Sequence, residues 1–150
     1  MQLLNATLSD LTEILPLVRA YHQYEGIELS DAVRKTAIAA LINNENLGRI
    51  WKIRVQQKLI GYVAICFGFS IEFGGRDAFI DELFISETFR GQGYGHRVLL
   101  EVSQKAVELG VHALHLEVAR DNNRAQKLYS TTGFTARNQF FLMSRSLSIK

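Results

Sequence analysis

The sequence predicts an α/β (α+β) fold, in which helices and strands alternate along one chain. The first observation is a βαβ unit: an apolar strand at residues 79–85, a glycine-rich turn, an amphipathic helix and a further alternating strand. The second is a hairpin formed by two apolar runs, residues 49–55 and 59–71. Because 150 residues that are 47% hydrophobic can bury a core, we expect residues 1–150 to form a single domain.

The segments before the glycine-rich turn follow a simple order. In the first hairpin strand, Trp51, Ile53 and Val55 alternate with charged residues, which indicates a half-exposed strand, whereas residues 62–69 are apolar on both faces and indicate a buried one. A Gly-Gly turn leads into the strand at residues 79–85, which carries two acidic residues. The remaining elements expected here are a strand at residues 2–7 and helices at residues 11–22 and 31–43.

The segments after the turn predict two helices and two strands. The helix carries apolar residues at spacings of three, four and seven and ends at Gly110. Residues 112–118 alternate and predict a strand, Asn122 is suited to cap a further helix, and residues 139–147 predict a last strand. The apolar residues of the first of these helices are Val98, Leu99, Val102, Ala106 and Leu109.

Three glycines, Gly91, Gly93 and Gly95, alternate in the turn before this helix. Glycines at the start of a helix leave backbone N–H groups uncovered where the helix dipole favours negative charge, so the turn predicts a site for a pyrophosphate. Neither a Walker loop nor a dinucleotide fingerprint fits, because His96 and Arg97 stand where those motifs need other residues.

Two motifs give the chain a resemblance to a known family. Arg90, Gly93 and Gly95 match the pattern Gln/Arg-x-x-Gly-x-Gly/Ala, by which the chain resembles the GNAT superfamily of N-acetyltransferases. The resemblance is sharp over residues 79–134 and implies a mixed, centrally splayed sheet of six to seven strands, with about four helices on both faces and acetyl-CoA in the splay. The second motif matches at Asn122, Ala125, Leu128, Tyr129, Gly133 and Phe134.

The resemblance also implies which residues bind the cofactor. Backbone amides of Leu83, Phe84 and Ile85 would hold the pantetheine and the thioester carbonyl. The charge distribution agrees, because residues 1–89 carry a net charge of −3 and residues 90–150 carry +5. The other cofactor-binding residues expected are Arg90, Gly91, Gln92, Gly93, Tyr94, Gly95, His96, Asn122 and Lys127.

Direct acetyl transfer in a ternary complex needs a neutral amine, and an amine with a pKa near ~10.4 must first lose a proton. Asp81 and Glu82 are the candidate acceptors of that proton, and strand alternation would send them to opposite faces. Which of them acts stays open: we favour Glu82, whereas the resemblance to polyamine and thialysine acetyltransferases supports Asp81. Tyr129 matches the family tyrosine that protonates the departing thiolate.

Tyr24, Glu25 and Glu72 are the candidate contacts for the acyl acceptor. Acidic and aromatic side chains suit a cation, so a small amine of polyamine or lysine-analogue type is the expected substrate. The alternatives are a peptide or protein amine (an N-terminus or a lysine), an aminoglycoside, or a non-catalytic acyl-CoA-binding module that uses Phe140 and Phe141 for interaction.

Other classes are disfavoured. The histidines show no metal-ligand spacing, so no metal is expected, and a net charge of +2 does not indicate nucleic-acid binding. There is no apolar leader and no apolar run long enough to span a membrane, so we expect a cytoplasmic protein that does not bind membranes, and Cys66 as a small core residue. Phe140, Phe141 and Met143 suggest a homodimer surface.

Overall fold

The computed structural model describes residues 1–147 and contains one five-stranded sheet in the order β1-β2-β3-β4-β5. Neighbouring strands are antiparallel except for β4 and β5, which are parallel. The α/β class is therefore confirmed. The strands are β1 (Gln2–Asn5), β2 (Gly48–Val55), β3 (Lys58–Ser70), β4 (Gly75–Ile85) and β5 (Ala113–His115). The helices are α1 (Leu11–Glu25), α2 (Asp31–Asn43), α3 (Tyr94–Glu108) and α4 (Asn123–Thr131), with short 3-10 turns η1 (Leu8–Asp10) and η2 (Glu87–Phe89).

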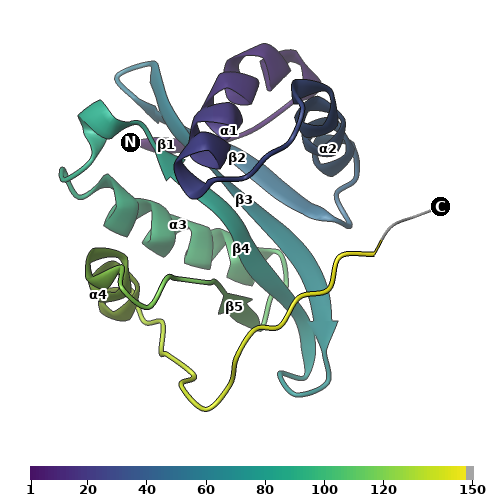
Figure 1. Cartoon of the computed structure of the whole chain (residues 1–150), viewed down its shortest axis with the longest axis vertical. Helices are drawn as coiled ribbons and strands as arrows, with labels where there is room; N and C mark the ends of the chain where they lie inside the picture. The colour runs from purple at the N-terminus through teal and green to yellow at the C-terminus, as the bar shows by residue number, and fades with distance from the viewer. Residues whose placement is uncertain (148–150) are drawn as a thin grey trace.

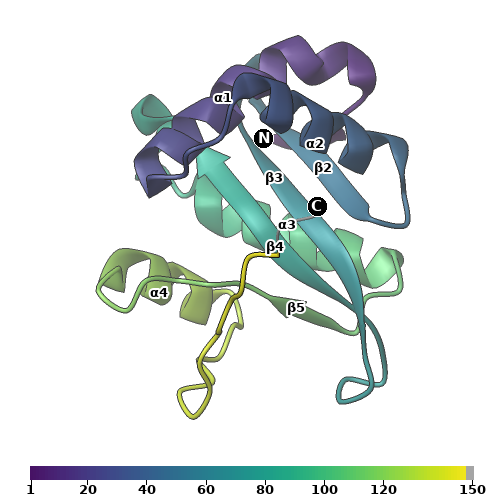
Figure 2. The ribbon, with the colours of Figure 1, turned by 45° about the vertical axis from the view of Figure 1, so that its right-hand side comes forward.

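Helices cover both faces of the sheet. Helices α1 and α2 lie on one face, and α3 and α4 lie on the other (Figures 1 and 2). The apolar stripe predicted for α3 is confirmed, because its residues pack against the α3-side core. The core on the α3 side includes Val63, Ile65, Val98, Leu99 and Val102, and the core on the α1/α2 side includes Ile14, Val18, Ile38, Tyr62 and Phe84.

Strand β4 contains a β-bulge at Asp81. Glu82 pairs with Ala64 while Ile80 pairs with Ile65, so β4 has one residue more than β3 at this point. Ile80 and Leu83 both pack into the core on the α3 side, and the two residues between them therefore lie on the α1/α2 side. The expectation that Asp81 and Glu82 point to opposite faces is wrong, because the bulge interrupts the alternation.

The sheet splays between β4 and β5. Only Asp77 to Phe79 of β4 pair with β5, although β4 continues to Ile85 (Figure 2). The amide of Ser86 donates to the carbonyl of Ile60 at 2.8 Å. Since backbone groups alternate along a strand, the amides of Leu83 and Ile85 point away from β3, towards the splay, and that of Phe84 points towards β3. The central splay that the resemblance implied is present.

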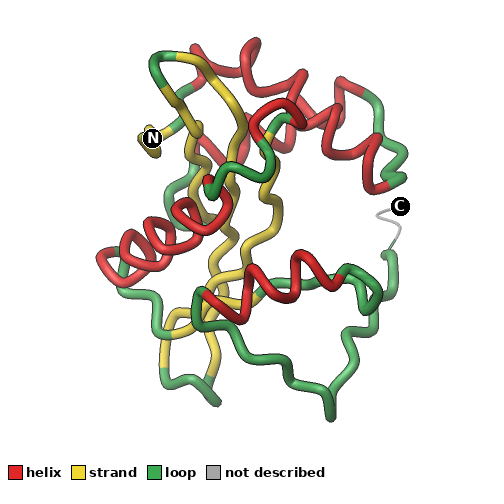
Figure 3. Tube along the Cα trace, turned by 90° about the vertical axis from the view of Figure 1, so that its left-hand side faces the viewer, coloured by secondary structure: helices red, strands yellow, loops and turns green. Residues whose placement is uncertain are grey.

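The last predicted strand is absent from the structure. Residues 139–147 form no strand, and the sheet within residues 1–147 has five strands rather than six or seven. The apolar run that suggested a strand, Phe140 to Met143, is exposed and has no strand beside it to pair with. The segment instead leaves α4 as a loop (Figure 3), held by Arg137, which pairs with Glu72 and stacks on the Phe140 ring.

No helix among residues 1–147 combines the length and the apolar character needed to cross a membrane.

Candidate active site

The glycine-rich turn opens the N-terminus of α3 to a ligand. Gly91 and Gly93 have φ angles of +77° and +81°, a left-handed conformation that other residues rarely adopt. Within residues 1–147, no backbone or side-chain group accepts a hydrogen bond from the amides of Gly93, Tyr94, Gly95 and His96. The first turn of α3 carries no acidic residue that would compete for these donors. The turn can therefore bind an anion through its backbone.

Helix α4 lies directly beside this turn. A Cβ atom on Gly95 would lie 3.2 Å from Leu128 Cδ2, and one on Gly91 would lie 3.5 Å from an Arg124 nitrogen. The predicted cap is confirmed: Asn122 Oδ1 accepts from the amide of Ala125 at 3.0 Å. The next residue, Tyr129, is partly buried, and its ring packs edge-on against Phe134 with 6.1 Å between the ring centroids.

Arg90 joins the turn to the end of α1. Its Nε donates to the carbonyl of Ile85 at 2.8 Å, and its guanidinium carbon lies 5.3 Å from the Tyr24 ring centroid and 5.4 Å from that of Phe84. Among the other expected cofactor contacts, His96 is partly buried in the first turn of α3, and Lys127 is exposed on α4. Arg90 therefore links the end of β4 to Tyr24 of α1, in addition to any contact that it makes with a ligand.

The two carboxylates of β4 have different surroundings. Glu82 is largely buried, and its Oε1 lies 2.6 Å from His22 Nε2 while its Oε2 accepts from the Tyr62 hydroxyl at 2.6 Å. Asp81 is exposed and has no side-chain hydrogen bond among the described residues. Partial loss of hydration raises the pKa of Asp81 above 3.8, and the negative charges of Glu82 and Glu117 add smaller contributions in the same direction. A carboxylate with a raised pKa is the better proton acceptor.

The end of α1 lies beside these carboxylates, since His22 of α1 meets Glu82. Burial raises the pKa of Tyr21 to about 12, and the charges of Glu25, Glu82 and Asp81 add to this shift. Burial also raises the pKa of Tyr129, with a further contribution from Glu25. These charge effects indicate that polar side chains of α1, β4 and α4 lie within electrostatic range of one another.

Glu72 does not join these residues. It lies in the turn before Gly75, and six residues of extended strand, roughly 20 Å, separate that glycine from Asp81. Its Oε1 also pairs with Arg137 NH2 at 2.7 Å. We therefore leave Glu72 out of the acceptor site.

Sequence reasoning did not predict that His22 and Tyr62 hold Glu82, or that Arg34 holds His22. Arg34 Nε donates to His22 Nδ1 at 3.0 Å, and both side chains are buried. One signal was available, because Ile14, Val18 and His22 recur every four residues on the apolar face of α1. A histidine on a buried face needs hydrogen-bond partners.

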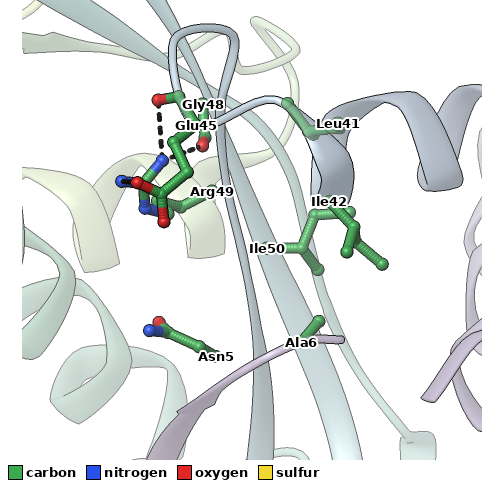
Figure 4. Close-up of a pocket in the computed structure, with 8 residues that line it drawn as sticks. All are labelled: Asn5, Ala6, Leu41, Ile42, Glu45, Gly48, Arg49 and Ile50. Atoms are coloured by element: carbon green, nitrogen blue, oxygen red, sulfur yellow. Dashed lines mark hydrogen bonds and ion pairs between the residues drawn. The ribbon is translucent and has the colours of Figure 1, made fainter. Parts of the chain in front are cut away.

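Two other hollows lie outside this site. A cavity of about 60 Å³ between α2 and β2 is lined in part by Arg49, which donates to the carbonyls of Glu45 and Gly48 (Figure 4). A groove of about 1470 Å³ lies between β5, α3, α4 and the loop after α4. The part of the chain that the structure describes contains no group of three or more His, Cys, Asp or Glu residues that could hold a metal.

Residues 11–134 match the sequence model of the Acetyltransferase (GNAT) family. The chain belongs to this family. The glycine-rich turn and the Asn122 to Phe134 motif both lie within the matched range. As a GNAT protein, the chain is an acyl-CoA-dependent N-acetyltransferase.

Individual relatives agree with this assignment. An uncharacterized N-acetyltransferase, YycN of Bacillus subtilis, is 33% identical over 57% of this chain, and the match spans about half (54%) of that relative's length. A thialysine N-epsilon-acetyltransferase of Bos taurus is 27% identical over 83% of this chain and 78% of its own length. The solved structure of integron cassette protein HFX_CASS3, from a salt-marsh metagenome, has a TM-score of 0.87 and 31% identity, and the match covers 99% of this chain and 92% of that one.

Proposed function

We propose that this GNAT protein transfers the acetyl group of acetyl-CoA directly to the primary amine of a small cationic acceptor, of polyamine or lysine-analogue type. The observation that carries the proposal is the bulge that places Asp81 and Glu82 on the same side of the sheet, facing the acidic and aromatic end of α1. Two adjacent carboxylates in one cleft attract an ammonium group. The relationship to a thialysine N-epsilon-acetyltransferase supports the same acceptor class.

The cofactor end of the site uses backbone groups. The open amides from Gly93 to His96 bind the pyrophosphate, and the amides of Leu83 and Ile85 hydrogen-bond the pantetheine and the thioester carbonyl in the splay. Bound acetyl-CoA supplies the acyl group. The Phe84 amide points towards β3 and therefore does not hydrogen-bond the pantetheine, contrary to the expectation from the sequence.

Proton transfer requires an acid and a base. Asp81 takes the proton of the ammonium group, because its carboxylate is exposed, has a raised pKa and can release the proton to solvent. Tyr129 donates a proton or a short hydrogen bond to the departing thiolate. Its raised pKa keeps the hydroxyl protonated throughout the neutral range.

The acceptor is tested by mixing purified protein and acetyl-CoA with a panel of amines and measuring thiol release. The panel contains a polyamine, lysine, thialysine, an aminoglycoside and a peptide with a free N-terminus. We expect the first three to be turned over best and Asp81→Asn to abolish this turnover. The matched control is Asp121→Asn at an exposed position on the loop before α4, which should leave the rate unchanged.

Other outcomes contradict specific parts of the proposal. Turnover of only the peptide or only the aminoglycoside would reject a small-amine acceptor. Calorimetric binding of coenzyme A without turnover of any amine would instead favour a non-catalytic acyl-CoA-binding module.

A further inference from the structure

A buried chain of hydrogen bonds connects α2 to the candidate active site through α1. Arg34 of α2 donates from Nε to His22 Nδ1 at 3.0 Å, and His22 Nε2 lies 2.6 Å from Glu82 Oε1. The side chains of Arg34 and His22 are only 8% and 7% exposed. The chain thus connects Glu82 of β4 to α2 through a single side chain of α1.

The chemistry of the partners fixes where the histidine carries its proton. An arginine Nε–H is always a donor, so His22 Nδ1 must accept and cannot hold a proton of its own in this arrangement. The ring proton is therefore on Nε2, from which it is donated to Glu82 Oε1. The Tyr62 hydroxyl donates to Oε2, so each oxygen of Glu82 receives a hydrogen bond. Two donors fix the orientation of the carboxylate.

The same arrangement closes a route for protons. A proton that reached Glu82 could leave through His22 only if Nδ1 released one on its far side, and Arg34 occupies that position. Asp81 has no such restriction, because it is exposed. The two adjacent carboxylates are therefore suited to different tasks.

We infer that His22 and Arg34 are positioning residues, which hold Glu82 as a fixed negative charge that attracts the cationic acceptor and leave proton transfer to Asp81. This inference rests on the proposed function for the meaning of the cleft. The hydrogen-bond arrangement itself does not depend on the reaction.

The surroundings of the network support a positioning role. Asp31 accepts from Arg34 NH1 at 2.9 Å, so the guanidinium of Arg34 is held by Asp31 at NH1 and by His22 at Nε. Asp31 also pairs with Arg19 of α1. The Tyr21 ring lies 5.9 Å from the His22 ring, centroid to centroid, and covers it on α1. Other titratable groups near the His22–Glu82 pair are Tyr62 and Cys66 of β3, Asp81 of β4 and Glu25 of α1.

The first test determines by nitrogen-15 NMR which ring nitrogen of His22 carries the proton. The variant His22→Gln identifies the signals that belong to His22. We expect the wild-type ring to carry its proton on Nε2 and not on Nδ1 at pH 7. In Arg34→Met, Nδ1 loses its donor, so the proton should no longer be restricted to Nε2. A wild-type ring protonated on Nδ1 would overturn the inference. The measurement needs only folded protein, so it gives an answer even if no amine is acetylated.

The second test separates positioning from folding by enzyme kinetics. Glutamine at position 22 can donate to Glu82 and accept from Arg34, whereas leucine can do neither. We expect His22→Leu to raise the KM for the amine about tenfold, with kcat reduced less than about threefold, the effect of losing roughly 1.4 kcal/mol of binding. His22→Gln should restore the KM to within about threefold of wild type.

His112→Leu is the matched control, because His112 is exposed and lies directly before β5, away from the His22–Glu82 pair. It should change neither constant. If His22→Leu and His22→Gln lowered kcat equally with KM unchanged, His22 would have a structural or proton-transfer role and the inference would fail. Unchanged constants in His22→Leu would also reject it.

Discussion

Gly95 of α3 and Leu128 of α4 pack so closely that a methyl group on Gly95 would lie 3.2 Å from Leu128 Cδ2. In Gly95→Ala the leucine must shift, and the methyl group also partly covers the open amides at the start of α3. We expect the KM for acetyl-CoA to rise about fivefold, while the free energy of unfolding changes by less than about 1 kcal/mol, because alanine is the better helix former.

Leu128→Ala supplies the comparison, because it removes the group that the methyl would touch. The double variant should lose less affinity for acetyl-CoA than the two single variants predict together. Additive losses would indicate that α4 does not restrict the turn. Leu100→Ala, at a half-exposed position of α3, is the neutral control.

Tyr129→Phe removes only a hydroxyl group from α4. If this hydroxyl protonates the thiolate, kcat should fall about 10- to 100-fold while the KM for acetyl-CoA stays within about twofold. Since burial raises the pKa of Tyr129 above 10, a fall in rate with its midpoint between pH 8 and 9 would come from another group. A pH series of kcat for both proteins checks this, and an unchanged kcat in the variant would remove the assigned role.

Asp81→Asn is expected to inactivate the enzyme without weakening the fold. A raised pKa means that the folded state favours the protonated carboxyl, so ionisation of Asp81 lowers stability at neutral pH and this cost disappears as the pH falls through its folded-state pKa. The variant should unfold about 2 °C higher than wild type at pH 7, with the difference shrinking on acidification. Thermal scans at several pH values measure this; a lower midpoint at pH 7 would contradict the raised pKa.

Lys52 of β2 pairs with Asp10, which ends the turn before α1, and both side chains are nearly buried. Burial alone would raise the pKa of Asp10, but hydrogen bonds from Lys52 and Thr7 outweigh it and lower the pKa below 3.8. Lys52→Met leaves the carboxylate without its partner and should reduce the free energy of unfolding by about 2 kcal/mol at pH 7.

The pH dependence follows from the sign of this shift. The stabilisation from Asp10 is complete above its unfolded pKa and is lost as the pH falls through the lower folded value. In urea unfolding between about pH 3 and 7, the difference between Lys52→Met and wild type should therefore shrink towards the acid end. A constant difference would show that Lys52 contributes through packing alone.

Local patterns in the sequence predicted most of the fold and the open amides at the start of α3. The spacing from Val98 to Ala106 identified α3 and its buried face, and Asn122 identified the start of α4. The glycines of the turn predicted open amides because a glycine pattern expresses backbone conformation directly. Each of these features depends on residues close together in the chain.

The acceptor end could not be predicted in the same way, because it depends on contacts between distant residues. Glu82 meets His22 across 60 positions, and no local pattern records that pairing. The bulge depends on the register between β3 and β4, which one strand alone does not specify. The apolar run from Phe140 resembles a strand by composition, but a strand also needs a neighbouring edge.

Asp81 is the extra residue in β4, so its deletion is expected to remove acetyl transfer and to leave coenzyme A binding intact. Removing Asp81 would leave Ile80 and Glu82 as direct neighbours on opposite faces, so no buried side chain would have to change sides. We expect a single-codon deletion here to yield a folded protein that still binds coenzyme A but no longer acetylates. One mutational step would thus convert such an enzyme into a protein that binds its cosubstrate without consuming it.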